Sequence, residues 1–205
     1  MTKQHWPGAA LLAPVPPVLV SCGTVDNPLC LTVAWTGILN TRPPRTYISV
    51  RPERHSYPVI KQSGEFVLNL PPASLARQVD FCGCRSGAKV DKFAHCHFTA
   101  EPTVHLAAPS IAQCPVSIEC QVFQVVKLGS HDLFMADILG VSVDEKLLDP
   151  AGRLQLEKAD LLAYAHGEYF ALGPKMGSFG FSVRKKQKHT VAKTAAQKNT
   201  GSKYR

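Results

Sequence analysis

Two long segments of alternating hydrophobicity, separated by a short turn, restrict the fold of this chain more than any other feature of its sequence. Residues 115–126 read PVSIECQVFQVV, and residues 131–143 read HDLFMADILGVSV. Gly129 and Ser130 between them are typical turn residues. Long segments joined by so few residues can pair with each other only as antiparallel strands. We therefore expect an antiparallel sheet built around this hairpin, and Gly140 is a candidate for a β-bulge.

Shorter runs of β-branched and aromatic residues predict the other strands. Two proline pairs, Pro43-Pro44 and Pro71-Pro72, interrupt these runs because proline cannot donate a ladder hydrogen bond. The predicted strands are residues 18–24, 30–35, 46–50, 65–70 and 168–172, and the predicted helices are residues 56–61, capped by Ser56, and 73–81, ending before Gly83. Many strands joined by turns, with few short helices, favour a mainly β antiparallel barrel over a parallel α/β sheet.

Charged and hydroxyl side chains follow the predicted strand 46–50 directly. They are Arg51, Arg54, His55 and Ser56. Two cations, an imidazole and a hydroxyl at a strand end suit an anion such as a phosphate monoester. Trp35 and Tyr47 nearby offer flat apolar surface, so a ligand with a phosphate at one end and a planar ring at the other would fit. The alternative is a core tryptophan beside a solvated charge cluster, and these residues alone leave both readings open.

The net charge of +8 is distributed unevenly along the chain. From Arg184 onward eight side chains are Lys or Arg and none is acidic, whereas residues 1–183 hold 15 basic and 15 acidic side chains. We therefore divide the chain into an N-terminal extension (residues 1–13), a folded domain (14–183) and a flexible basic tail (184–205). The tail has no aromatic residue before Tyr204, so nucleic-acid binding is a remote alternative.

The apolar run near the N-terminus is short and interrupted by prolines, and no segment approaches about 18 uninterrupted apolar residues. We expect neither a signal peptide nor a membrane span. Seven cysteines are then expected to be reduced thiols of a cytoplasmic protein. Cys82 and Cys84 lie too close together for the usual structural zinc site and no second pair follows, so we expect no metal.

Seven segments, taken in order, resemble the flavin reductase-like family of FMN-binding split barrels, which includes the flavoredoxin-like proteins. They are LTVAWTG, the double-proline turn with ISVRPERHS, EFVLNLP, CGCRSGAKVDKF, PVSIEC, SHDLFMADI and EYFALG. The resemblance runs from about residue 14 to residue 181, nearly the whole predicted domain. It implies a six-stranded Greek-key barrel, one FMN per subunit, and a homodimer whose interface helps to build the flavin site.

The resemblance also implies which residues surround the flavin ring. Thr32, Ala34 and Trp35 would line the isoalloxazine ring, and Asn69 with Leu70 would pass along its polar edge. His131 and Tyr169 match positions that approach the flavin in similar proteins. They would reach the flavin either from the same subunit or from the second subunit of the dimer. Close relatives carry an asparagine where this chain has Leu29, and Asn27, on the same strand face, is the candidate to replace it.

A second group of residues would hold the phosphate and the ribityl chain. They are Arg51, His55 and Ser56 after the strand, and Ser86, Lys89 and Lys92 in the glycine-containing segment 82–93. Hydroxyl and ammonium donors are what a phosphate cradle requires. Lys92 is expected to be a solvated loop lysine that contributes little to fold stability.

By resemblance the protein would be an FMN-dependent oxidoreductase that takes electrons from a reduced nicotinamide or a redox partner protein. The alternative is a non-catalytic FMN-binding electron carrier. Because a flavin supplies the reactive atom itself, the protein contributes mainly orientation and hydrogen bonds, and no catalytic acid or base is assigned. No nicotinamide-binding fingerprint is present in the sequence, so the electron donor stays open.

Overall fold

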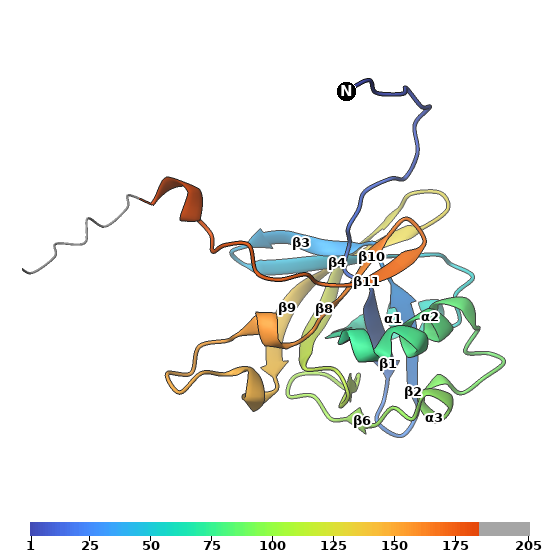
Figure 1. Cartoon of the computed structure of the whole chain (residues 1–205). Helices are drawn as coiled ribbons and strands as arrows, with labels where there is room; N and C mark the ends of the chain where they lie inside the picture. The colour runs from blue at the N-terminus through green and yellow to red at the C-terminus, as the bar shows by residue number, and fades with distance from the viewer. Residues whose placement is uncertain (185–205) are drawn as a thin grey trace, which may run out of the picture. The chain divides into compact units, whose positions relative to one another are not determined.

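The computed structural model describes residues 1–184 (Figure 1). The chain divides into two compact units, Met1–Gly173 and Pro174–Arg205. In the described part of the second unit, a single 3-10 turn forms at Phe181–Val183. The predicted basic tail, residues 184–205, lies outside the described residues except for Arg184. Within residues 1–184, none of the helices has the length and apolar character needed to cross a membrane.

Seven antiparallel strands form the main sheet. Their order across the sheet is β2-β1-β5-β8-β9-β4-β3. The strands are β1 (Val18–Gly23), β2 (Pro28–Val33), β3 (Thr36–Thr41), β4 (Pro44–Val50), β5 (Glu65–Leu70), β8 (Val116–Lys127) and β9 (Asp132–Val143). The mainly β prediction is confirmed. The described sheet has seven strands where the resemblance implied six, because residues 36–41, which carried no predicted strand, pair with β4.

The predicted long hairpin is present at the centre of this sheet. β8 and β9 are each 12 residues long and pair along their whole length. The register shifts where Glu119 pairs with Gly140 and Cys120 pairs with Ile138, which leaves Leu139 as the extra residue. The irregularity predicted at Gly140 therefore falls one position away. A second shift lies between Val122 and Gln124.

The two edge strands of the sheet are consecutive in the chain, and this closes the sheet into a split barrel. β2 ends at Val33 and β3 begins at Thr36, so only Ala34 and Trp35 connect the two edges. The amide of Ser49 on β4 donates to the carbonyl of Trp35 at 2.9 Å, outside the regular ladder. The opening of the barrel therefore lies beside Ala34 and Trp35.

Two hydrophobic clusters fill the inside and cover one outer face of the barrel. The inner cluster is centred on the fully buried Phe66, Phe134 and Ile48. In the outer cluster, side chains of β1 and β2 pack against α2 (Ala76–Cys84) and α3 (Lys92–Cys96). Helix α1 (Tyr57–Ser63) packs on β1 and β5 and adds Tyr57 and Ile60 to the inner cluster.

The predicted helix boundaries need correction at two points. A 3-10 turn at Ala73–Leu75 precedes α2, and α2 continues through Gly83 to Cys84 instead of ending before the glycine. Ser56 is the N-cap residue of α1, but its side chain makes no capping hydrogen bond. The segment 82–93, predicted to be a loop, is a loop only at residues 85–91, because α2 extends to Cys84 and α3 begins at Lys92.

Small elements cover the remaining edges. A short hairpin joins β10 (Leu162–Ala165) to β11 (Glu168–Ala171), and the bridge between Val15 and Tyr164 ties it to the N-terminal segment. β6 (Ala100–Glu101) pairs with β7 (Ser110–Ile111). The loop between β9 and β10 also holds the 3-10 turns Glu145–Leu147 and Leu156–Lys158.

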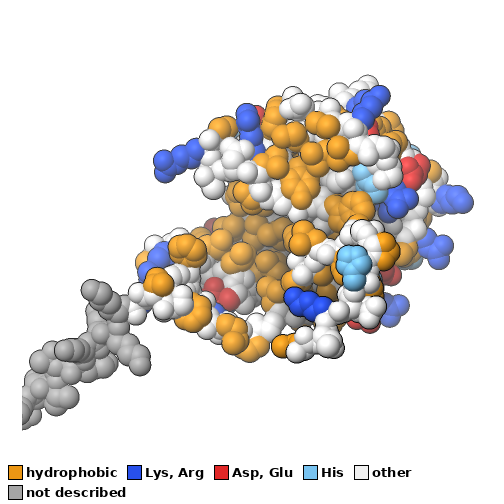
Figure 2. Space-filling view, turned by 90° about the horizontal axis from the view of Figure 1, so that it is seen from above, with side chains coloured by type: hydrophobic (Ala, Val, Ile, Leu, Met, Phe, Trp, Pro, Cys, Tyr) orange, Lys and Arg blue, Asp and Glu red, His pale blue; other side chains and the backbone are white. Residues whose placement is uncertain are grey.

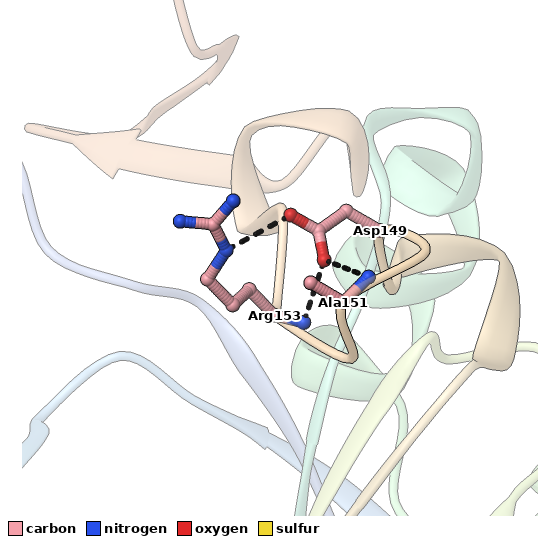
Figure 3. A network of polar contacts seen from close by, with 3 residues as sticks. All are labelled: Asp149, Ala151 and Arg153. Carbon is pink, nitrogen blue, oxygen red and sulfur yellow. Dashed lines mark hydrogen bonds and ion pairs between the residues drawn. The ribbon is translucent and has the colours of Figure 1, made fainter.

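One carboxylate organises the tight turn in this loop (Figure 3). Asp149 accepts hydrogen bonds from the amides of Ala151 and Arg153, both at 2.9 Å, and from Nε of Arg153 at 3.1 Å. The hydrogen bond from the backbone amide of Arg153 is the main reason why the pKa of Asp149 is below its usual value.

Candidate functional site

A cavity of about 390 Å³ opens where the barrel is split. Its walls come from the end of β2 with Ala34 and Trp35, the end of β4, the last turns of α2, His131 at the start of β9, and the β10–β11 hairpin. Of the residues predicted for the flavin ring, Thr32, Ala34, Trp35, His131 and Tyr169 all line this cavity. The structure thus brings together residues that are up to 137 positions apart in the chain.

Trp35 is a cavity residue and not part of the core. It is 46% exposed, and its ring lies 4.6 Å from the ring of His131, tilted by 40°. Burial, followed by the positive charge of Arg51, lowers the pKa of His131 below its usual value, so its imidazole is neutral at pH 7. The two side chains form an apolar, uncharged surface, and the core reading of Trp35 is wrong.

The wall opposite the tryptophan is fixed by two hydrogen bonds to α2. The hydroxyl of Thr32 donates to the carbonyl of Val79, and Nη1 of Arg54 donates to the carbonyl of Gly83 at 2.7 Å. A side chain at Gly83 would lie in ordinary van der Waals contact with Thr32, at 3.4 Å. The guanidinium completes the C-terminal turn of the helix, where a positive charge is favourable.

The β10–β11 hairpin closes the cavity from the same chain. Tyr164 and Tyr169 lie side by side with ring centroids 5.2 Å apart, and the hydroxyl of Tyr169 donates to Asp80 at 3.4 Å. Burial, together with the negative charge of Asp80, raises the pKa of Tyr169 to about 12. Tyr169 therefore stays protonated at neutral pH and needs no second subunit to reach the site.

A second cavity of about 330 Å³ borders the first through Leu31, Arg51, Arg54 and Cys84. It holds most of the residues predicted for the phosphate: Arg51, His55, Ser56, Ser86 and Lys92. Gly87 also lines it, and a side chain at Gly87 would come within 2.9 Å of the His55 ring. The cations, the hydroxyls and the imidazole thus meet at one place, beside the ring-sized cavity.

Lys92 differs from its prediction as a solvated loop lysine. It is the first residue of α3 and only 6% exposed. Its ammonium donates to the carbonyls of Cys30 at 2.9 Å and Cys82 at 2.7 Å. Burial lowers the pKa of this ammonium, while the nearby Cys30 and Cys82 thiols act in the opposite direction. Lys92 therefore joins β2 to α2 beneath the second cavity, and two of its three donor positions are occupied.

Three predicted residues lie away from these two cavities. Asn69 is fully buried, and its side chain bonds to Leu19, Ser21, Ile111 and Ser117. All of its polar groups are used inside the domain, so it cannot serve the edge of a ligand ring in this arrangement.

The other two are Leu70 and Lys89. Leu70 packs against the inner cluster and against a smaller one formed by Val116, Leu147 and Ala159. Lys89 is exposed and lines two other hollows, one of about 440 Å³ that also contains Asn27 and Leu29. Asn27, the candidate to replace the usual asparagine, faces neither the ring-sized cavity nor the second cavity.

Four residues of the site were not assigned from the sequence. Arg54 had a signal, because it belongs to the charged cluster after β4, but it was left without a role. Arg85 had one too, because it lies in the glycine-containing segment 82–93. Tyr164 and Asp80 had none, since only the folding of β10 and α2 brings them to the cavity.

The cysteines make sulfur contacts but no metal cluster in the part of the chain that the structure describes. Cys30 and Cys82 have their sulfurs 3.7 Å apart, and those of Cys82 and Cys96 are 3.8 Å apart. All seven cysteines are free thiols, and Cys84 is the exposed one among them. Burial raises the pKa of Cys22, Cys96 and Cys114 to about 12, which keeps these thiols protonated at neutral pH.

The two adjoining cavities fit a flavin mononucleotide in their donor chemistry. An isoalloxazine ring needs an apolar, largely aromatic slot, which Trp35, His131, Tyr164 and Tyr169 supply. A phosphate dianion needs guanidinium, hydroxyl and amide donors, which gather in the second cavity.

Comparisons with known proteins agree with this geometry. Residues 12–173 match the family model described as "Flavin reductase like domain". The chain is 31% identical over 138 residues to an uncharacterised protein of Archaeoglobus fulgidus, which covers 67% of this chain and 77% of that protein.

Solved structures give the same result. Flavoredoxin of Desulfovibrio vulgaris (Miyazaki F) superposes with a TM-score of 0.81 at 30% identity, covering 89% of this chain and 99% of that protein. Nitrilotriacetate monooxygenase component B from Bacillus cereus shares the fold, with a TM-score of 0.73 at 18% identity over 82% of this chain and 88% of that protein. This chain belongs to the flavin reductase-like domain family.

Proposed function

We propose that the protein binds FMN in the two adjoining cavities and acts as an oxidoreductase. The observation that carries the proposal is their adjacency: a cavity closed by aromatic rings shares a wall, at Arg51 and Arg54, with a cavity rich in cations and hydroxyls. A mononucleotide with a tricyclic ring has this division of chemistry. Bound FMN would supply the electron and hydride chemistry, and the chain would supply orientation.

The roles of the residues follow from their positions. Trp35 and His131 would cover one face of the ring, and Tyr164 with Tyr169 would close the other side of the cavity. Arg51, His55 and Ser56 would hold the phosphate. Arg54 bonds the helix carbonyl of Gly83 and would mainly keep the two cavities aligned. No residue of the cavity is assigned a proton transfer.

The first measurement is an absorption spectrum of the purified protein, in which bound flavin gives bands in the blue and near ultraviolet. We expect Arg51→Ala to weaken FMN affinity about 10- to 150-fold, because a charge-assisted hydrogen bond contributes about 1.5–3 kcal/mol. Arg51 is an exposed side chain paired only loosely with Glu53 at 3.6 Å, so its loss should leave the fold intact. Quenching of flavin fluorescence measures the affinity.

The matched control is Lys146→Ala, an exposed cation in the 3-10 turn after β9, at the opposite end of the hairpin from His131. Its affinity for FMN should equal that of the wild type. Equal affinity in Arg51→Ala as well would place the phosphate outside the second cavity and remove the basis of the proposal.

A second candidate function is a non-catalytic electron carrier, which the 30% identity to a flavoredoxin favours. The two functions differ in one assay. An enzyme oxidises NADH or NADPH rapidly when it is the only protein present, whereas a carrier does so only after a partner reductase is added. Steady oxidation by the purified protein alone would exclude the carrier function.

We also propose a two-fold symmetric homodimer. Apolar side chains stand exposed along β3, β8 and β9, among them Ile38, Phe123, Leu139 and Val141. Figure 2 shows hydrophobic side chains spread over much of the face seen from above. Exposed apolar surface of this extent is typical of an interaction site.

Light scattering is expected to give about twice the chain mass of 22.3 kDa, because an isologous contact uses the same patch on both copies. A second measurement at tenfold lower protein concentration serves as the control for weak self-association. A species of single-chain mass that holds flavin tightly would contradict the dimer.

A further inference from the structure

Beyond the second cavity lies a third, of about 420 Å³, which the FMN proposal does not use. It borders the second cavity through Cys84, Arg85 and Ser86. A ligand in the phosphate cavity could therefore extend into it without crossing the protein. The remaining wall comes from the end of α2, the connection to α3, and α3 itself.

An aromatic stack forms one side of this third cavity. The rings of Phe81 and His95 lie 3.9 Å apart with only 12° between their planes. His95 is exposed, so a further flat ring can extend the stack. Val90 adds apolar surface next to it. A heteroaromatic base would find here what it needs for stacking.

The cations of the second and third cavities exceed what one phosphate monoester balances. Leaving out Lys92, which is buried beneath the second cavity, the described lining residues include four cations, Arg51, Arg54, Arg85 and Lys89. They include one carboxylate, Glu53, so the surplus is three positive charges. A phosphate monoester carries about −1.5 to −2 at pH 7, so at least about one positive charge stays unbalanced.

The unbalanced positive charge lies at the third cavity. Within residues 1–184, neither Arg85 nor Lys89 makes an ion pair with a carboxylate, and the carboxylate of Asp91 caps α3 at the amide of Ala94. Ser86 adds a hydroxyl between them. Two unpaired cations and a hydroxyl beside an aromatic stack suit a second phosphate that is attached to a base.

We propose that the third cavity binds an adenosine phosphate, with the base on the Phe81–His95 stack and the phosphate on Arg85 and Lys89. The proposal rests on flavin binding in the neighbouring cavities. Two sources share this chemistry: the adenylate half of a flavin adenine dinucleotide, continuous with the flavin, and the adenylate half of a separate nicotinamide dinucleotide. The experiment separates them.

The first arm titrates ADP into the FMN-loaded protein by calorimetry. Saturable binding is expected, weakened about 10-fold in Arg85→Ala and in Lys89→Ala. Lys89 lines the third cavity but not the second, so Lys89→Ala should leave the affinity for FMN unchanged. The second arm compares FMN with FAD on the flavin-free protein. Tighter binding of FAD, lost in the same two variants, assigns the site to the dinucleotide flavin. Lys146→Ala is the control in both arms, and circular dichroism confirms that the variants fold.

Binding in either arm with this dependence supports the proposal and names the source. The proposal is overturned if ADP does not bind and FAD binds no more tightly than FMN. It is also overturned if ADP binds equally well to all variants or only displaces FMN. A protein that binds neither flavin would end the proposed function, and the ADP titration would then test the third cavity on its own.

Discussion

Lys92→Met is expected to lower the free energy of unfolding by about 2–4 kcal/mol, although the residue is charged and was predicted to be a solvated loop lysine. Methionine fills a similar volume but cannot donate to the carbonyls of Cys30 and Cys82. A buried carbonyl that loses its hydrogen-bond partner costs about 1–3 kcal/mol of stability. Part of this cost is offset because the folded variant no longer has to bury a charged ammonium. The variant should also melt about 5–15 °C lower.

Urea unfolding followed by circular dichroism measures this difference. The matched control is Lys89→Met in the preceding connection, where the side chain is exposed and the change should stay within about 0.5 kcal/mol. Equal stability of the two variants would mean that the Lys92 ammonium does not hold β2 and α2 together.

Asn69→Ala is expected to cost about 3–5 kcal/mol of stability, the largest effect predicted for a single substitution in this chain. Its amide nitrogen donates to Leu19 and Ser21, and its oxygen accepts from Ile111 and Ser117, with the side chain fully buried. Alanine removes all these bonds and leaves the amide of Ile111 without its acceptor.

The control for this variant is Asn27→Ala, at an exposed turn position between β1 and β2. It should unfold like the wild type. FMN affinity measured on the remaining folded fraction of Asn69→Ala separates a structural role from a ligand contact. Weakened FMN binding with unchanged stability would restore Asn69 to the edge of the ring and contradict the structural assignment.

The fold was accessible from the sequence wherever a strand was long or carried an alternating pattern. The β8–β9 hairpin shows this most clearly, since its period of two extends over both strands. β3 was missed because Gly37 and Asn40 are weak strand formers, and its pairing with β4 comes from the closure of the barrel.

The site was predictable to the extent that its residues follow one another in the chain. Arg51, His55 and Ser56 share one cavity, as the sequence suggested. Lys92 and Asn69 could not be placed, because sequence shows the type of a polar side chain but not whether it is solvated or satisfied inside the core. Their roles depend on partners between 10 and 62 positions away.

The β10–β11 hairpin, which brings Tyr164, Gly167 and Tyr169 to the ring cavity, determines when during synthesis that cavity becomes complete. A nascent chain released as far as the end of β9 at Val143 already contains every strand of the main sheet. It still lacks the β10–β11 hairpin, which ends at Ala171. At about 5–20 residues per second, translation needs about 1–6 s more to supply it. The sheet can therefore form on the ribosome before a complete binding site exists, and loading with cofactor belongs to the finished chain.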